Sequence, residues 1–244
     1  MKDLLTIYKR ELVSYFSQPI AYAVIVIYLL LVMVLTFSLG SFIDIGDASL
    51  TYSFFLYQPF ALMILVPAVG MRQWAEETRS GTIELIGTYP ISLWAVIAGK
   101  FKAAATVWLI AIALTFPIWI TVNYLGKPDN LAILSGYIGT FLLACSYLAI
   151  STFISAMTRD QVVALIVSLF ITVVLTMATF TPFVQFFTTI FDEDVKDAIT
   201  AVGPWDHFLS PARGAFRLQD IVWFLSVILA GVLGTSAILS AKRA

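Results

Sequence analysis

The sequence has few of the residues that build soluble domains, metal sites and nucleic-acid surfaces. Only 12% of its 244 residues are charged, and it contains one cysteine and one histidine. Soluble domains carry about 25% charged residues. A single cysteine excludes an intramolecular disulfide and a thiolate metal cluster. The net charge of -1, without any run of Lys and Arg, excludes the basic surface that a phosphate backbone requires, so no nucleic-acid partner is expected.

The chemistry of an enzyme or an ion-coupled carrier is also missing. A phosphate-binding loop needs the pattern G-x-x-x-x-G-K-[ST], but Gly99-Lys100 has Trp94 at the first glycine position and Phe101 after the lysine. The apolar runs hold no catalytic pair or metal set, which argues against an intramembrane protease or transferase. Their interiors carry no ionisable residues of the kind that proton relays use.

Apolar residues dominate instead. They make up 60% of the chain, and the mean hydropathy is +0.95. A membrane-spanning helix needs about 20 predominantly apolar residues. The sequence therefore predicts an all-α polytopic membrane protein with six transmembrane helices. The first is too long for a signal-peptide core and is expected to be retained. The six runs lie near 20–40, 54–71, 97–124, 131–157, 161–181 and 221–241.

The distribution of positive charge predicts the orientation. Cytoplasmic segments of membrane proteins carry an excess of Lys and Arg. If the N-terminus lies inside, most of the 14 Lys and Arg residues are cytoplasmic, and both termini are expected to face the cytoplasm. The residues on that side are Lys2, Lys9, Arg10, Arg72, Arg79, Lys100, Lys102, Arg159, Lys242 and Arg243.

The segment 1–18 precedes the first span and has its own periodicity. Apolar side chains recur on one face, with polar residues opposite, as in a helix that lies in the membrane interface. We expect an interfacial elbow helix here; an ordinary juxtamembrane stretch is the alternative. The face comprises Leu5, Tyr8, Leu12 and Phe16, together with Leu4 and Tyr15.

The segment 72–92 is a charged loop between the second and third spans. Residues 72–79 continue the second span as a charged helix, and Ser80-Gly81 interrupts it. A short second helix with an apolar side is expected from Thr82 until Tyr89-Pro90. Such a helix either fills a groove on a partner or rests on lipid headgroups; its glutamates favour the partner.

This loop resembles the signature of type-2 ABC-exporter permeases. The matching residues are Glu76-Glu77, Gly81-Thr82-x-Glu84-Leu85, Tyr89-Pro90-Ile91-Ser92 and Gly99-Lys100. The resemblance extends over essentially the whole chain. Within that superfamily the sequence is most similar to short permeases of the gliding-motility and nitrous-oxide-reductase-maturation type.

The resemblance implies one transmembrane domain, residues 1–244, that acts as half of a transporter in a bacterial inner membrane. It pairs with a second copy or a paralogous permease and with a separate ABC ATP-binding subunit, which holds ATP and magnesium, so this chain is not itself an enzyme. Such families often work beside a membrane subunit with a large extracytoplasmic domain. The residues that would couple to the ATPase are Glu76, Glu77, Gly81, Thr82, Ile83, Glu84, Leu85 and Pro90.

The segment 182–219 is long for a connection and too aromatic for a solvated loop. Its prolines exclude one continuous helix, so re-entrant helices on the outer side are expected. They form either an outer gate or an aromatic belt that anchors the protein. His207 is interpreted as a packed polar residue rather than a ligand. The candidate gate residues are Phe183, Phe186, Phe187 and Phe191.

The sequence therefore predicts the permease subunit of an ATP-driven exporter. The alternative is a membrane scaffold, or a subunit that transmits mechanical force, which anchors an ATPase without moving a substrate.

Overall fold

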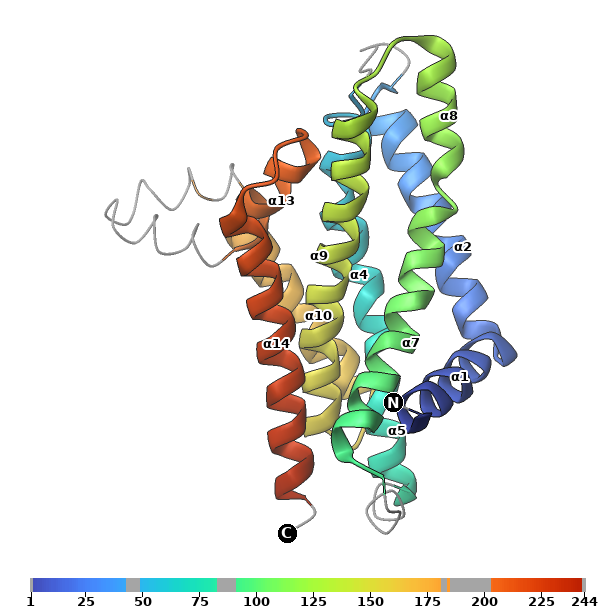
Figure 1. Cartoon of the computed structure of the whole chain (residues 1–244), viewed down its shortest axis with the longest axis vertical. Helices are drawn as coiled ribbons and strands as arrows, with labels where there is room; N and C mark the ends of the chain where they lie inside the picture. Colours follow the sequence, from blue (N-terminus) through green and yellow to red (C-terminus); the bar gives the residue numbers. More distant parts are fainter. Residues whose placement is uncertain (1, 43–48, 83–90, 181–183, 185–202, 243–244) are drawn as a thin grey trace.

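A computed structural model gives the arrangement of the chain (Figure 1). It describes residues 2–42, 49–82, 91–180, 184 and 203–242, and the regular elements in these ranges are all helical. The helices are α1 (Lys2–Ser17), α2 (Pro19–Val34), η1 (Leu35–Leu39), η2 (Phe55–Tyr57), α4 (Gln58–Gly70), α5 (Arg72–Ser80), α7 (Leu93–Ala113), α8 (Phe116–Leu125), α9 (Asn130–Met157), α10 (Gln161–Ala178), α13 (Pro204–Ala212) and α14 (Leu218–Ala241).

Within the described residues, six helical segments are long and apolar enough to cross a membrane, which confirms the predicted multi-pass, all-helical class. The described chain begins and ends at the same end of the bundle, as an even number of crossings requires (Figure 1). We call this end, where α5 lies, the α5 end. The segments are Pro19–Leu39, Phe55–Ser80, Leu93–Leu125, Asn130–Met157, Gln161–Ala178 and Leu218–Ala241.

Helix α9 is the centre of the bundle (Figure 1). In the most apolar part of α9, 67% of the residues are buried, compared with 22% in the corresponding part of α10 and of α14. Small residues allow the close packing, as is typical of membrane helices. Gly136 lies against the ring of Phe55, and Gly231 of α14 lies against the backbone of Ala149. Helices α4, α5, α7, α10, α13 and α14 all pack directly on α9, whereas α1 and α2 pack on α7 and α4.

Helix α1 lies across the bundle at the α5 end and packs against α7 (Figure 1). Its most buried apolar residue is Ile7, which contacts Gly99 and is 7% exposed. Tyr8 bonds Thr106 through the two hydroxyls at 3.1 Å, whereas Leu5 is 51% exposed. The predicted face thus includes a residue that points away from the protein and leaves out Ile7. The position of α1 relative to a membrane remains a prediction.

Helix α4 contains a proline whose missing donor is compensated by a neighbouring helix. In an α-helix, the N–H of residue 67 would donate to the carbonyl of Met63, but Pro67 has no N–H. The hydroxyl of Thr172 in α10 donates to the Met63 carbonyl at 2.9 Å. An unpaired carbonyl inside a membrane costs several kcal/mol, so this contact ties α4 to α10.

Helices α4 and α9 touch where α4 ends. A methyl group on Gly70 would lie 2.4 Å from the β-carbon of Ser151, which is a backbone-anchored atom and cannot swing aside. Glycine is therefore required at this crossing, and the approach brings the next turn of α9 within reach of the start of α5.

We expect Gly70→Ala to destabilise the fold. Overpacking costs about 1–3 kcal/mol, and this contact belongs at the upper end of that range, which exceeds the gain in helix propensity of about 1 kcal/mol. The melting temperature in detergent should fall, and a second change, Ser151→Gly, should restore most of it. Gly126→Ala is the control, since its nearest neighbour would be an oxygen 3.9 Å away. Equal melting temperatures for the two alanine variants would contradict the packing argument.

Candidate functional site

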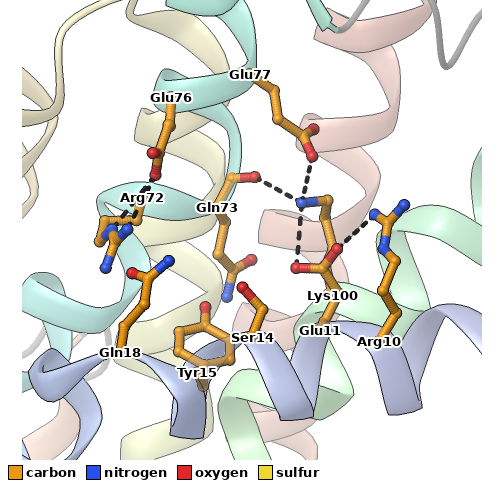
Figure 2. Close-up of a pocket in the computed structure, with 10 residues that line it drawn as sticks. All are labelled: Arg10, Glu11, Ser14, Tyr15, Gln18, Arg72, Gln73, Glu76, Glu77 and Lys100. Atoms are coloured by element: carbon orange, nitrogen blue, oxygen red, sulfur yellow. Dashed lines mark hydrogen bonds and ion pairs between the residues drawn. The ribbon is translucent and has the colours of Figure 1, made fainter.

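A buried lysine joins three helices at the α5 end. Ser92 caps α7 by accepting from the backbone N–H of Ala95, and Lys100 lies two turns further along that helix. Lys100 is only 4% exposed. Its Nζ lies 2.7 Å from Glu77 Oε1 of α5 and 3.5 Å from Glu11 Oε2 of α1, and it donates to the carbonyl of Gln73 at 3.2 Å (Figure 2).

The surroundings of Lys100 satisfy its charge. An ammonium group has three N–H donors, and these three oxygens match them. The ring of Trp74, itself 1% exposed, lies 5.2 Å from Nζ and adds a cation–π contact. A buried charge is costly unless it is paired and hydrogen-bonded. One buried charge therefore links both α1 and α5 to α7.

A polar cavity of about 350 Å³ opens between α1, α5 and α7 beside this cluster. Its acidic and basic side chains are equal in number, and each acid contacts a base, as Figure 2 shows. Arg10 donates to Glu11 Oε1 at 2.6 Å, and Arg72 lies 3.2 Å from Glu76. The lining residues are Arg10, Glu11, Ser14, Tyr15, Gln18, Arg72, Gln73, Glu76, Glu77 and Lys100.

The protonation of two lining groups follows from their neighbours. The hydrogen bond with Glu11 raises the pKa of Arg10 above its ordinary value. Burial, followed by the charge of Glu11, raises the pKa of Tyr15, which stays a neutral hydroxyl. Within the described residues, no group of three or more His, Cys, Asp or Glu side chains could hold a metal ion. The acids and bases that line the cavity therefore neutralise one another.

The hydroxyl of Ser155 in α9 holds the start of α5. It donates to the carbonyl of Met71 at 2.7 Å and accepts from the backbone N–H groups of Trp74 at 3.1 Å and Ala75 at 3.0 Å. Ser155 is fully buried. Thr152, one turn earlier in α9, lies 3.0 Å from the side-chain oxygen of Gln73. Helix α5 is thus attached to α9 as well as to α1 and α7.

The predicted coupling residues separate into two groups in the structure. Glu77 points inward to Lys100, whereas Glu76 pairs with Arg72 and keeps 52% of its side chain exposed. Gly81 ends α5 in a left-handed conformation, φ +74°, which glycine adopts without strain. This confirms the expected helix and its interruption. Ile83, Glu84, Leu85 and Pro90 lie outside the described residues, so the second helix of the loop remains a prediction.

The sequence did not predict the role of three residues of this site. In the sequence, Lys100 is one of the cytoplasmic positive charges and part of the Gly99-Lys100 match, and neither pattern predicts that it is buried; Glu11 and Ser155 carry no signal at all. A lysine near the start of an apolar helix is itself an indication, because such a lysine needs acidic partners if its side of the helix packs. The partners could not be named, since Glu11 lies 89 positions away in the sequence.

The opposite end of the bundle contains a second buried polar pair. His207 Nδ1 of α13 lies 2.8 Å from Asp220 Oδ1 of α14, and the imidazole stacks on the ring of Trp223 at 5.1 Å. Asp220 is 1% exposed. His207 thus occupies the packed role that the sequence predicted. The candidate gate residues Phe183, Phe186, Phe187 and Phe191 lie outside the described residues.

The sequence matches the model of a known protein family. The model of the family described as "ABC-2 family transporter protein" matches residues 59–213, from α4 through α13, which is well over half of the sequence. The chain belongs to the ABC-2 transporter family. No curated protein matches it.

Membership defines the general role of the protein. ABC-2 proteins are the transmembrane permease components of ABC transporters, not the ATPases, and the family implies an ABC ATP-binding partner. The six apolar helices agree with a multi-pass membrane protein. The narrower similarity to permeases of the gliding-motility and nitrous-oxide-reductase-maturation type remains a prediction.

We expect Lys100→Met to destabilise the ABC-2 fold by about 3 kcal/mol, because it leaves Glu77 without its cation, while Glu11 keeps only Arg10. This is the low end of the range for buried pairs, since Glu77 and Glu11 keep 18% and 17% of their side chains exposed. Adding Glu77→Gln should recover part of the loss, which a double-mutant cycle of melting temperatures measures.

Lys102→Met is the matched control for this variant, because Lys102 is exposed on the same helix. Its melting temperature should stay at the wild-type value. Additive effects of Lys100→Met and Glu77→Gln would show that the pair carries no coupling energy.

Proposed function

We propose that this chain is the permease subunit of an ABC exporter. It works as a dimer with a second copy or a paralogous permease, and it couples ATP hydrolysis on a separate subunit to the export of a substrate across a bacterial inner membrane. Both termini face the cytoplasm. Membership of the ABC-2 family supports the transporter class, and the arrangement of α5 supports the coupling role.

The attachment of α5 is the observation that carries this proposal. Helix α5 is bonded through Lys100 to α1 and α7, and through Ser155 to α9, and it forms the first part of the segment 72–92 that carries the signature. A force applied to the loop therefore reaches three helices at once. A scaffold that only anchors an ATPase needs an adhesive surface but no such internal connection, which favours the exporter.

In this proposal, the helix expected after Gly81 docks on the ATP-binding subunit. Its apolar residues Ile83 and Leu85 would enter a cleft on the ATP-binding subunit, and the exposed Glu76 would face basic residues there. The inward-facing Glu77 would act within the permease instead, through Lys100.

Docking predicts that the double change Ile83→Asp and Leu85→Asp abolishes recovery of the ATPase. An affinity-tagged permease is purified from membranes of its native host, and ABC ATP-binding subunits in the eluate are quantified by mass spectrometry. An ABC ATP-binding subunit should co-purify with the wild type. Its amount should fall at least tenfold with the double variant, which should still insert in the membrane.

Leu131→Asp is the control for this loss. Leu131 is 77% exposed in the first turn of α9, at the opposite end of the bundle, where the helix dipole favours an acid. This variant should retain the ATPase. Equal recovery with wild type and the double variant would exclude the docking surface. An ATPase that binds normally to a permease that moves no substrate would favour the scaffold.

The orientation predicts opposite labelling of two cysteines. In a Cys145→Ser background, Ser80→Cys should react with an impermeant maleimide only after the cells are lysed, because it lies in the cytoplasmic loop. Asp194→Cys, in the segment expected on the outer side, should react in intact cells. The reverse order would place α5 outside the cell, away from any ATPase, and would overturn the proposal.

A further inference from the structure

At the junction of α4 and α5, the side-chain hydroxyl of Ser155 in α9 interrupts the series of main-chain hydrogen bonds. In a continuous helix, the N–H of Ala75 donates to the carbonyl of Met71. Here the Ser155 hydroxyl lies between them: it accepts from Ala75 at 3.0 Å and donates to Met71 at 2.7 Å. Trp74 N–H donates to the same oxygen at 3.1 Å. A side chain inserted in this way is a recognised cause of helix bending.

The neighbouring packing explains why Ser155 can reach this position. Gly70 and Ser151 are in close contact, and Ser155 lies one turn beyond Ser151 on α9. The preceding irregularity in α4, at Pro67, is tied to α10 by Thr172. Two hydroxyls on two helices therefore hold the second span, and the Ser155 contact lies at the first turn of the helix that carries Glu76 and Glu77.

We propose that Ser155 is a positioning residue that sets the angle of α5 relative to α9, and that this angle determines how the permease drives its ATPase. The coupling part of this inference rests on the proposed function; the angle does not. Without the hydroxyl, Ala75 N–H and the Met71 carbonyl can pair with each other. The second span then straightens, and Glu77 moves relative to Lys100. The variant should thus remain folded but hold α5 in a different place.

The angle is tested by the distance between spin labels on Arg79→Cys in α5 and Leu131→Cys at the far end of α9. Both positions are exposed, and the labels are introduced in a Cys145→Ser background in lipid nanodiscs. Ser155→Ala should shift or broaden the main distance peak. Ser151→Ala is the matched control: it removes a buried hydroxyl one turn away on α9 that bonds only its own helix, at the Tyr147 carbonyl. Identical peaks for both variants and the wild type would overturn the proposal.

A second measurement needs no variant of Ser155. Hydrogen exchange of peptides covering Trp74 and Ala75 in the wild type should be as slow as that of the core of α9, because a buried hydroxyl pairs both amides. Exchange as fast as that of Ser80 at the end of α5 would contradict the proposed contact, even if Ser155→Ala could not be purified in folded form.

The coupling part is tested on the complex with its co-purified ATPase. Ser155→Ala should lower kcat for ATP hydrolysis several-fold, with an unchanged KM for ATP and unchanged recovery of the ATPase; Ser151→Ala should change none of these. A shifted distance with an unchanged kcat would overturn the role in coupling. Loss of the ATPase from the wild type itself would instead refute the proposed function, and the label distances would still decide the role of Ser155 in setting the angle.

Discussion

The organisation of the α5 end depends on one buried ammonium group. Lys100 is enclosed by protein, and a charge in such a place is tolerated only with partners of good geometry. Those partners come from α1 and α5, so neither helix can leave α7 without exposing or orphaning a charge. Helices α1 and α5 are thus both linked to α7 through the same side chain. The cavity beside them contains equal numbers of acids and bases, which pair with one another.

Hydroxyl groups provide the second kind of constraint. Main-chain groups at a helix irregularity cannot be left unpaired in a membrane. Thr172 of α10 donates to the carbonyl that Pro67 leaves without a donor, and Ser155 of α9 takes the place of the bond between Ala75 and Met71. Serine and threonine are small and uncharged, so they fit where helices approach as closely as Gly70 and Ser151 do. The hydrogen bonding along the second span therefore depends on tertiary contacts as well as on the local sequence.

Much of the fold could be predicted from the sequence, because its signals are local. The absence of charge over about 20 residues marks a span, and the charged continuation to Ser80 followed by Gly81 marks α5 and its end. The contacts that hold α5 could not be predicted in the same way. Ser155 is 84 positions from Met71 and Glu11 is 89 positions from Lys100, and no periodicity links residues so far apart. In α1 the pattern indicated the helix correctly, but it selected the exposed Leu5 and missed the buried Ile7, because the position of the apolar face depends on how α1 crosses α7.

The central claim is that α5 transmits force as a unit with α1 and α9. Hydrogen exchange of the permease, bound to its ATPase with and without a non-hydrolysable ATP analogue, tests it most directly. The account predicts that nucleotide binding changes exchange together in three segments: residues 72–82, residues 7–15 of α1, and the part of α9 around Ser155. A change confined to residues 83–90, with α1 and α9 unaffected in a fully formed complex, would contradict it.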